Sequence, residues 1–223
     1  MKKLFFITLA FLFSTNLAFA GVVKGFTTLD SWGTISQNTL VVGGTADVSG
    51  NYRSVLFIDA CITSGTATTN GLEIIVQGSS ASAGDNNWED ITRYSVLSGV
   101  TGNKEQITNN PAAAGTTVFT VASTTGYGLA GTYPAQQLYI QDGTLANSEI
   151  RVITTISANT SVTVETGSTY AHNLSTPMYN LVVTQPVDIP DNIGRVRVIY
   201  NNRADSAGST YDIRSNVVTI TGI

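Results

Sequence analysis

Alternating apolar and polar positions recur along the chain and predict β-strands. The clearest alternation lies in residues 194–201, where every second side chain from Val196 to Tyr200 shares one face. Continuous apolar runs at residues 54–62 and 72–77 are typical of strands inside a sandwich. Because no stretch of ten or more residues has a helical period, the chain is predicted to be all-β.

Turn residues separate these predicted strands. Residues 72–77 are expected to form a hairpin with residues 88–94, across a polar reversal rich in Ser, Gly and Asn. Pro186 and Pro190 are expected to bracket a turn. The residues from Asp30 to Gly33 are expected to break the first strand of the chain, which lies in residues 21–28.

A segment with shorter predicted strands interrupts this pattern at residues 111–179. It opens on the breaker run Pro-Ala-Ala-Ala-Gly and then carries short strands with its own Gly- and Asn-rich turns. We therefore expect a β-sandwich of the immunoglobulin-like or jelly-roll-like kind, built from residues 21–110 and 180–223. Residues 111–179 are expected to form an inserted small β-barrel-like domain.

The first twenty residues have the pattern of a secretion signal. Lys2 and Lys3 precede an uncharged apolar run, and Ala18-Phe19-Ala20 supplies a small-x-small cleavage pattern ahead of Gly21. The apolar run is shorter than the roughly 20 residues that a membrane span needs. The sequence therefore predicts an exported protein, extracellular or at the cell surface, with no membrane span after the signal is removed.

Composition narrows the function classes. Charged residues make up 12% of the chain, about half of the roughly 25% that is usual in globular domains. Removal of Lys2 and Lys3 from the 11 basic residues leaves 9 against 15 acidic ones, a net charge of −6. Such a balance argues against nucleic acid as a partner, because phosphate binding needs clustered Lys and Arg.

The apolar run at residues 54–62 contains two residues of chemical interest. Cys61 is the only cysteine, so no disulfide forms within the chain. A strand interior favours a buried Cys61 that packs as a small hydrophobe, the alternative being an intermolecular or reactive thiol. Asp59 is the one acid in this run and is expected to lie at a rim or to have a hydrogen-bond partner.

Catalytic chemistry is not indicated. His172 is the only histidine, and no nucleophile elbow accompanies it, so we expect a structural role for it and no enzyme activity. Glu73 and Glu149 lie on predicted strands, where glycosidase carboxylates could sit, but some pair among 15 acids always fits such a spacing. One His and one Cys exclude the usual zinc sites.

Two kinds of binding site are left open by the sequence, and no cofactor other than calcium is expected. Calcium could be held by acidic loops, although neither loop follows the EF-hand pattern. The candidate calcium ligands are Asp85, Asp90, Asp188 and Asp191. A sugar could stack on aromatic rings, which in β proteins otherwise serve as core edges or subunit contacts. The candidate stacking residues are Trp88, Tyr127 and Tyr133.

The strand after the cleavage site also has two interpretations. It is either the edge strand of its own sandwich or an extended arm that completes the sheet of a neighbouring subunit. In the second case Val22, Val23 and Phe26 are the side chains expected to enter the neighbour's groove.

Several segments resemble known proteins. The strand at residues 72–77, the Trp88-Glu89-Asp90 segment and residues 195–202 resemble β-sandwich accessory proteins of bacteriophage and prophage structural gene sets. The insert resembles a small β module that recurs in such proteins, and the matching parts are Val121 to Gly126, Asp142-Gly143, Glu149 to Ile153 and Ala171-His172. The resemblance implies a structural role and brings no catalytic residue. Virion proteins assemble in the cytoplasm, so the signal segment implies instead an exported protein on a related scaffold.

Three hypotheses follow. The first is a secreted, non-enzymatic structural protein that assembles with copies of itself into a fibre, pilus-like filament or surface layer by strand complementation. The second is a monomeric adhesin or carbohydrate-binding module whose partners are cell-surface glycans. The third, an enzyme such as a glycan hydrolase, has no motif to support it.

Overall fold

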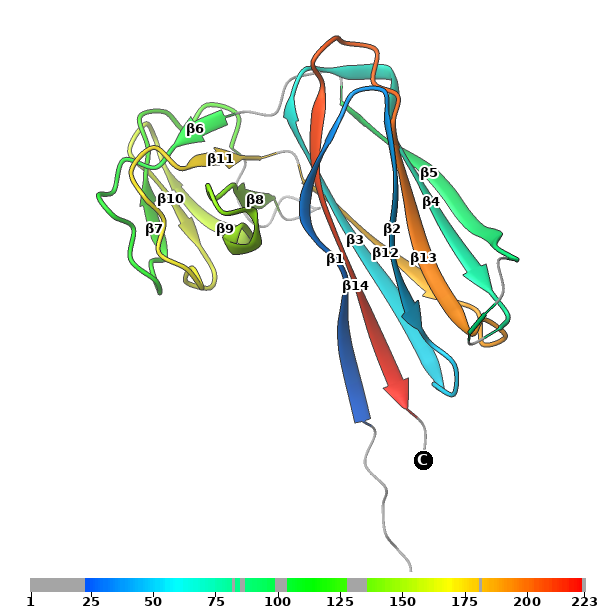
Figure 1. The fold of residues 1–223 in the computed structure, drawn as a ribbon. Coiled ribbons are helices and arrows are strands. Elements are labelled where there is room, and N and C mark those ends of the chain that lie inside the picture. Colours follow the sequence, from blue (N-terminus) through cyan, green and yellow to red (C-terminus); the bar gives the residue numbers. More distant parts are fainter. Residues whose placement is uncertain are drawn as a thin grey trace, which may run out of the picture.

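The chain folds as an all-β sandwich with a smaller barrel-like module at its side, as the sequence predicts (Figure 1). The structure is a computed structural model that describes residues 23–81, 83–84, 87–98, 104–127, 136–180 and 182–221. Within these residues we find no helix long and apolar enough to cross a membrane.

Two four-stranded antiparallel sheets form the sandwich. The first, which we call the docking sheet, has the order β1 (Val23–Ser36), β14 (Thr210–Thr221), β3 (Arg53–Ser64) and β12 (Val182–Ile189). The second, the far sheet, has the order β2 (Thr39–Asp47), β13 (Arg195–Asn202), β4 (Ala67–Ser79) and β5 (Glu89–Ser98). Strands from the two ends of the chain are neighbours in both sheets, so the sandwich closes only when the whole chain is present.

The core lies between these two sheets. Inward-facing side chains alternate with outward-facing ones, so that Leu56 and Ile58 of β3 face Val198 and Tyr200 of β13, each at most 1% exposed. The alternation expected over residues 194–201 is confirmed by the burial of every second residue of β13. The expected hairpin is confirmed too, since Ile74 of β4 lies opposite Tyr94 of β5.

The first strand is longer than the sequence indicated. The expected break at Asp30 to Gly33 is wrong, because β1 continues through it to Ser36 with two register shifts against β14. These irregularities turn the Asp30 carboxylate toward the far sheet. It accepts hydrogen bonds from the Gly44 amide at 2.7 Å, the Tyr200 hydroxyl at 2.9 Å and the Ser215 hydroxyl at 2.7 Å. Asp30 therefore ties the two sheets together.

Proline does not interrupt the sheet where a turn was expected. The prediction of a turn between Pro186 and Pro190 is wrong, because β12 runs unbroken to Ile189 with Pro186 opposite Phe57. The reason is that β12 is an edge strand whose only strand neighbour is β3 in the described part of the chain. An edge strand tolerates proline, since one side of its backbone has no ladder to complete.

The module is a strongly curved six-stranded sheet with its own core. Its order is β6 (Lys104–Gln106), β11 (Pro177–Tyr179), β8 (Gln137–Ile140), β9 (Glu149–Ser157), β10 (Ser161–Val164) and β7 (Val118–Thr120), with a short 3-10 turn, η1 (Leu145–Asn147), between β8 and β9. Its two edges approach each other, because the Thr108 amide donates to the Thr120 carbonyl at 2.8 Å. Since β6 pairs with β11, this sheet starts before Pro111 in the chain.

Replacement of Asp30 by alanine should destabilise the sandwich by about 3 kcal/mol, because two buried hydroxyls and one amide lose a charged acceptor. Urea unfolding followed by tryptophan fluorescence measures this change in the free energy of unfolding. Asp188→Ala is the matched control, because its pair with Arg53 is exposed to solvent and should contribute far less than Asp30 does. Equal costs for the two variants would contradict the role given to Asp30.

Candidate functional site

The module packs on the outer face of the docking sheet through an aromatic cluster. Trp32 of β1 and Cys61 of β3 contact Tyr139 of β8 and Tyr179 of β11. The ring centroids of Trp32 and Tyr139 are 4.5 Å apart, and those of Tyr139 and Tyr179 are 6.1 Å apart. All four residues are at most 7% exposed, so this is a dry contact between sandwich and module.

Asp212 of β14 lies at the polar edge of this cluster and is fully buried. One carboxylate oxygen accepts from the Thr34 hydroxyl of β1 at 2.6 Å. The other accepts from the Tyr139 hydroxyl and from the Gln141 amide, each at 2.7 Å. Two of the three donors belong to the module, so the charge of Asp212 is compensated only when the module is in place.

A second buried carboxylate lies one row further along the docking sheet. Asp59 accepts from Arg214 at 2.6 and 3.0 Å and from the Thr184 hydroxyl at 2.7 Å. The hydrogen-bond partner expected for Asp59 is thus confirmed. The Arg214 guanidinium also lies 4.9 Å from the centre of the Trp32 ring. This row marks the end of the contact between module and sheet.

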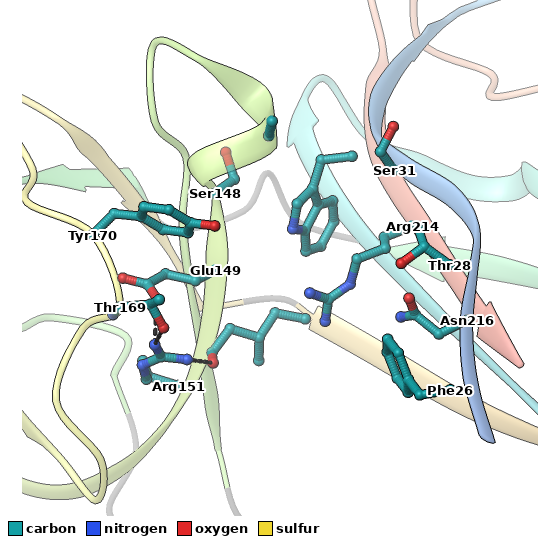
Figure 2. Close-up of a pocket in the computed structure, with 13 residues that line it drawn as sticks. Phe26, Thr28, Ser31, Ser148, Glu149, Arg151, Thr169, Tyr170, Arg214 and Asn216 are labelled. Carbon is teal, nitrogen blue, oxygen red and sulfur yellow. Dashed lines mark hydrogen bonds and ion pairs between the residues drawn. The ribbon is translucent and has the colours of Figure 1, made fainter. Parts of the chain in front are cut away.

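A cleft of about 360 Å³ opens beside the contact, with the sandwich as one wall and the module as the other (Figure 2). Trp32, Arg214 and Asn216 line the sandwich wall, and Arg151 and Tyr170 line the module wall. Figure 2 shows Tyr170 and Phe26 on opposite sides of the opening. The remaining lining residues are Thr28, Ser31, Ala146, Ser148, Glu149, Ile150 and Thr169.

The module wall of the cleft is held by His172. Its imidazole is 0% exposed and lies between two carboxylates, with Nδ1 3.0 Å from Asp142 Oδ2 and Nε2 2.7 Å from Glu149 Oε1. The second Glu149 oxygen binds Arg151 and accepts from the Thr169 amide at 2.9 Å. Both ring nitrogens are thus bonded to carboxylates and sealed from solvent, which makes His172 a brace between strands.

The electrostatics of this brace follow from its geometry. Burial alone would lower the pKa of His172, but the hydrogen bonds to Glu149 and Asp142 outweigh it and raise the pKa above its ordinary value. Burial alone would raise the pKa of Glu149, but His172, the Thr169 amide and Arg151 together lower it. With a carboxylate oxygen on each ring nitrogen, the geometry favours the charged form of both partners.

The aromatic residues expected to stack on sugar do not form one platform. Trp88 lies on the sandwich under two guanidinium groups, with Arg197 4.2 Å and Arg195 5.1 Å from the ring centre. Tyr127 lies in the module core, and its hydroxyl donates to the Met178 carbonyl. Tyr133 lies outside the described residues. A flat ring face open to a sugar is therefore absent at Tyr127.

The acidic residues expected to hold calcium are dispersed or already paired. Asp90 accepts hydrogen bonds from Gln77 and Arg93, and Asp188 pairs with Arg53 at 2.6 Å. Asp191 is exposed in the turn after β12, and Asp85 lies outside the described residues. In the parts of the chain that the structure describes, no three His, Cys, Asp or Glu side chains gather as a metal site would require.

The N-terminal strand is paired in its own chain. Val23 and Phe26 lie on β1, opposite Thr221 and Val218 of β14, with side chains 63% and 69% exposed. Val22 lies outside the described residues. The structure therefore has the edge-strand arrangement, and it leaves both described residues mostly exposed.

The thiol of Cys61 is buried beneath the module, as expected for a structural cysteine. Burial, and then the nearby charge of Asp212, raise its pKa well above the ordinary value. Contact of Cys61 with solvent therefore requires the module to leave the docking sheet.

No local pattern in the sequence predicts the cleft itself. Trp32 and Arg214 are far apart in the chain, and Trp32 lay in a segment interpreted as a strand break. One signal was available: Asp212 and Arg214 alternate with the apolar Tyr211 and Ile213 on β14. Charged residues at alternate positions of a strand indicate that its second face is polar. The partners of these two residues, Asp59 for Arg214 and Tyr139 for Asp212, lie in distant segments of the chain.

Comparisons with known proteins place the chain near no family. No protein-family model matches it, and none of the curated proteins matches it. Among solved structures, one of the infectious bursal disease virus Gt strain is similar with a TM-score of 0.28 and 13% identity, over 91% of this chain and 34% of that one. The present chain thus spans about a third of that protein's length.

A capsid protein of bacteriophage P23-77, VP17, is similar with a TM-score of 0.21 and 12% identity, over 90% of this chain and 99% of VP17. These similar structures are viral, and VP17 is a capsid protein. At such scores the likeness carries no argument about the function of this chain.

Replacement of His172 by glutamine should destabilise the module by about 3 kcal/mol near pH 6, because two buried carboxylates lose a cationic partner. Because the pKa of His172 is raised in the folded state, its contribution to stability is complete below the unfolded pKa of about 6.5. That contribution is lost as the pH rises through the folded pKa. The lowered pKa of Glu149 gives stability that is complete above about 4.3 and is lost as pH falls through its folded value.

The difference in unfolding free energy between wild type and His172→Gln should therefore be largest between about pH 4.3 and pH 6.5 and should shrink toward pH 9. Urea unfolding at a series of pH values measures it, and His172 is the only histidine that could titrate in this range. A difference that stays constant from pH 5 to pH 9 would show that the imidazole is not held as a cation.

Proposed function

We propose that this is a secreted, non-enzymatic structural protein that assembles with copies of itself outside the cell. The observation that carries the proposal is the half of the docking sheet's outer face that the module leaves uncovered. It carries five apolar side chains and lies at the edge strand that the sequence singled out as a subunit contact.

Two neighbouring rows of side chains make this uncovered face. In the first row Phe26 of β1 lies beside Val218 of β14, which lies beside Val55 of β3. In the second row Phe57 of β3 lies between Pro186 of β12 and the polar Asn216 of β14. Leu56 and Val217, their neighbours along the strands, face the core, so these five apolar residues face away from it. An apolar sheet face of this kind marks an interaction site more often than a solvated surface.

A second copy of the chain is the occupant that these features favour. The charged residues at the margin of the face, Arg53 and Asp188, neutralise each other at 2.6 Å and leave little net charge for a charged partner to meet. The edge strands β1 and β12 bound the face, and each has a strand neighbour on one side only in the described part of the chain. Backbone groups on the other side are able to pair with a strand of another copy.

Strand exchange is the mechanism we propose for this contact. The β1 strand makes its ladder with β14 within one chain, and the same ladder forms when β1 of one copy pairs with β14 of the next. Val22, Val23 and Phe26 then contact the neighbour's uncovered face. Because donor and acceptor surfaces differ, the contact repeats head to tail and yields a fibre or pilus-like filament.

The non-enzymatic part of the proposal rests on His172. The single imidazole of the chain is closed to solvent and bonded at both nitrogens to carboxylates, so no substrate atom can reach it. Residues 1–20 support the export part of the proposal through their charged start, apolar run and cleavage pattern.

The double variant Val23→Ser, Phe26→Ser should abolish polymers and leave a folded monomer. Both side chains are mostly exposed in the single chain, so their loss should change the unfolding free energy by less than about 0.5 kcal/mol. Protein is collected from the culture medium, where Gly21 is expected as its first residue, and is compared by sedimentation velocity and negative-stain electron microscopy.

Leu174→Ser is the control, because Leu174 is an exposed apolar residue that belongs to the module and not to the docking sheet. It should leave polymers unchanged. Polymers that persist in the double variant, or a wild-type protein that is monomeric at all concentrations, would contradict the proposed assembly.

A further inference from the structure

The cleft between module and sandwich contains buried donors that no described residue satisfies. In the described part of the chain, three buried side-chain polar atoms have no hydrogen-bond partner, and two of them, Trp32 Nε1 and Arg151 Nε, belong to residues that line this one cleft. Trp32 is 7% exposed. An unpaired buried donor costs on the order of 1–3 kcal/mol, so two together indicate a place where acceptors are meant to arrive from outside.

The charges around the cleft point to an anionic group. Arg151 and Arg214 lie on opposite walls. Asp59 binds Nε and one terminal nitrogen of Arg214, which leaves the other terminal nitrogen for a ligand. The carboxylate of Glu149 is fully used by His172, Arg151 and the Thr169 amide, so it offers no free acceptor. The lining is thus rich in donors and poor in acceptors, which suits a carboxylate.

The opening of the cleft adds two aromatic rings. Phe26 on the sandwich side is 69% exposed and Tyr170 on the module side is 40% exposed, and Figure 2 shows them on opposite sides of the opening. Pockets that hold a small ligand combine apolar ring faces with a few placed polar groups, within about 300–1,000 Å³. At about 360 Å³ this cleft has room for a single ring that carries a charged substituent.

We propose that the cleft binds a carboxylate-bearing sugar, such as one hexuronate unit of an acidic polysaccharide. The carboxylate enters between Arg214 and Arg151 and supplies acceptors to Trp32 Nε1 and Arg151 Nε. The sugar ring lies between Phe26 and Tyr170. Arg214, whose side chain is 31% exposed, makes the first contact, and the enclosed nitrogens gain their partners as the ligand settles.

Four residues of the cleft, Phe26, Thr28, Ser31 and Trp32, lie on β1. A monomer contains the whole site, and in an assembly formed by strand exchange the β1 of a neighbouring copy supplies these four residues. A filament built from such subunits would present one acidic-sugar site per copy, which raises its avidity for a polysaccharide.

Titration calorimetry at low salt with trigalacturonate, the neutral trigalactose and a triglutamate peptide tests the proposal. We expect binding of trigalacturonate at least about tenfold tighter than that of either other ligand, and weaker binding as salt is added. No binding of trigalacturonate, equal binding of the neutral trimer, or tighter binding of the peptide would each overturn the proposal.

Two variants locate the binding in the cleft. Ala146→Trp fills the opening from an exposed position and should weaken binding of trigalacturonate at least about tenfold. Ala158→Trp, at an exposed turn elsewhere in the module, is the control and should bind normally. Asn216→Asp adds a negative charge that repels the ligand's carboxylate without adding bulk, and it should also weaken binding. Normal binding by both Ala146→Trp and Asn216→Asp would overturn the assignment to this cleft.

Discussion

The buried carboxylate of Asp212 is the constraint on which the arrangement of the molecule depends. A charged group with no exposure is costly unless it is fully hydrogen-bonded, and its donors come from β1, from β8 and from Gln141 just after β8. The sandwich alone supplies one of the three. A sandwich without the module would therefore leave Asp212 with the Thr34 hydroxyl as its only described partner. The carboxylate specifies where the module lies on the sheet, and the aromatic cluster around Trp32 adds the apolar contact.

The position of the module creates both surfaces that we connect with function. The module covers the rows of the docking sheet that contain Asp212 and Asp59, and the rows around Phe26 and Phe57 stay open. At the boundary between covered and open rows the module wall stands away from the sheet, and the cleft lies there. The His172 brace fixes that wall, since it joins Asp142, next to the end of β8, to Glu149 at the start of β9. Assembly face and cleft are thus consequences of one internal contact.

Local pattern was enough to predict the all-β class, the sandwich, the alternation of β13 and the hairpin of β4 and β5. The local pattern was misleading where the tertiary context decides the conformation of a segment. Pro186 was interpreted as a turn residue because the sequence does not tell an edge strand from a central one. Asp30 was interpreted as part of a break because a bulge and a turn use the same residue types. In both cases the sheet order, which is a property of the whole chain, overrode the local signal.

The candidate site was less accessible to sequence reasoning than the fold. Its residues come from both ends of the chain and from the insert, and no motif joins them. Two of the three aromatic residues expected to stack on sugar lie elsewhere: Trp88 is covered by arginines and Tyr127 packs in the module core. The residues that do line a cleft, Trp32, Arg151 and Arg214, each have an ordinary structural explanation when they are considered alone. Only their convergence, with two unpaired nitrogens, indicates a ligand.

Labelling of Cys61 tests the central claim most directly, because this single thiol lies beneath the module on the docking sheet. The account predicts that the native protein reacts slowly with a thiol reagent at pH 8. Tyr139→Phe, which removes one donor to Asp212, should raise the rate about tenfold, at denaturant concentrations too low to unfold the sandwich. Equal rates for wild type and Tyr139→Phe, or reaction of Cys61 only when the whole chain unfolds, would contradict the claim that Asp212 holds the module in place.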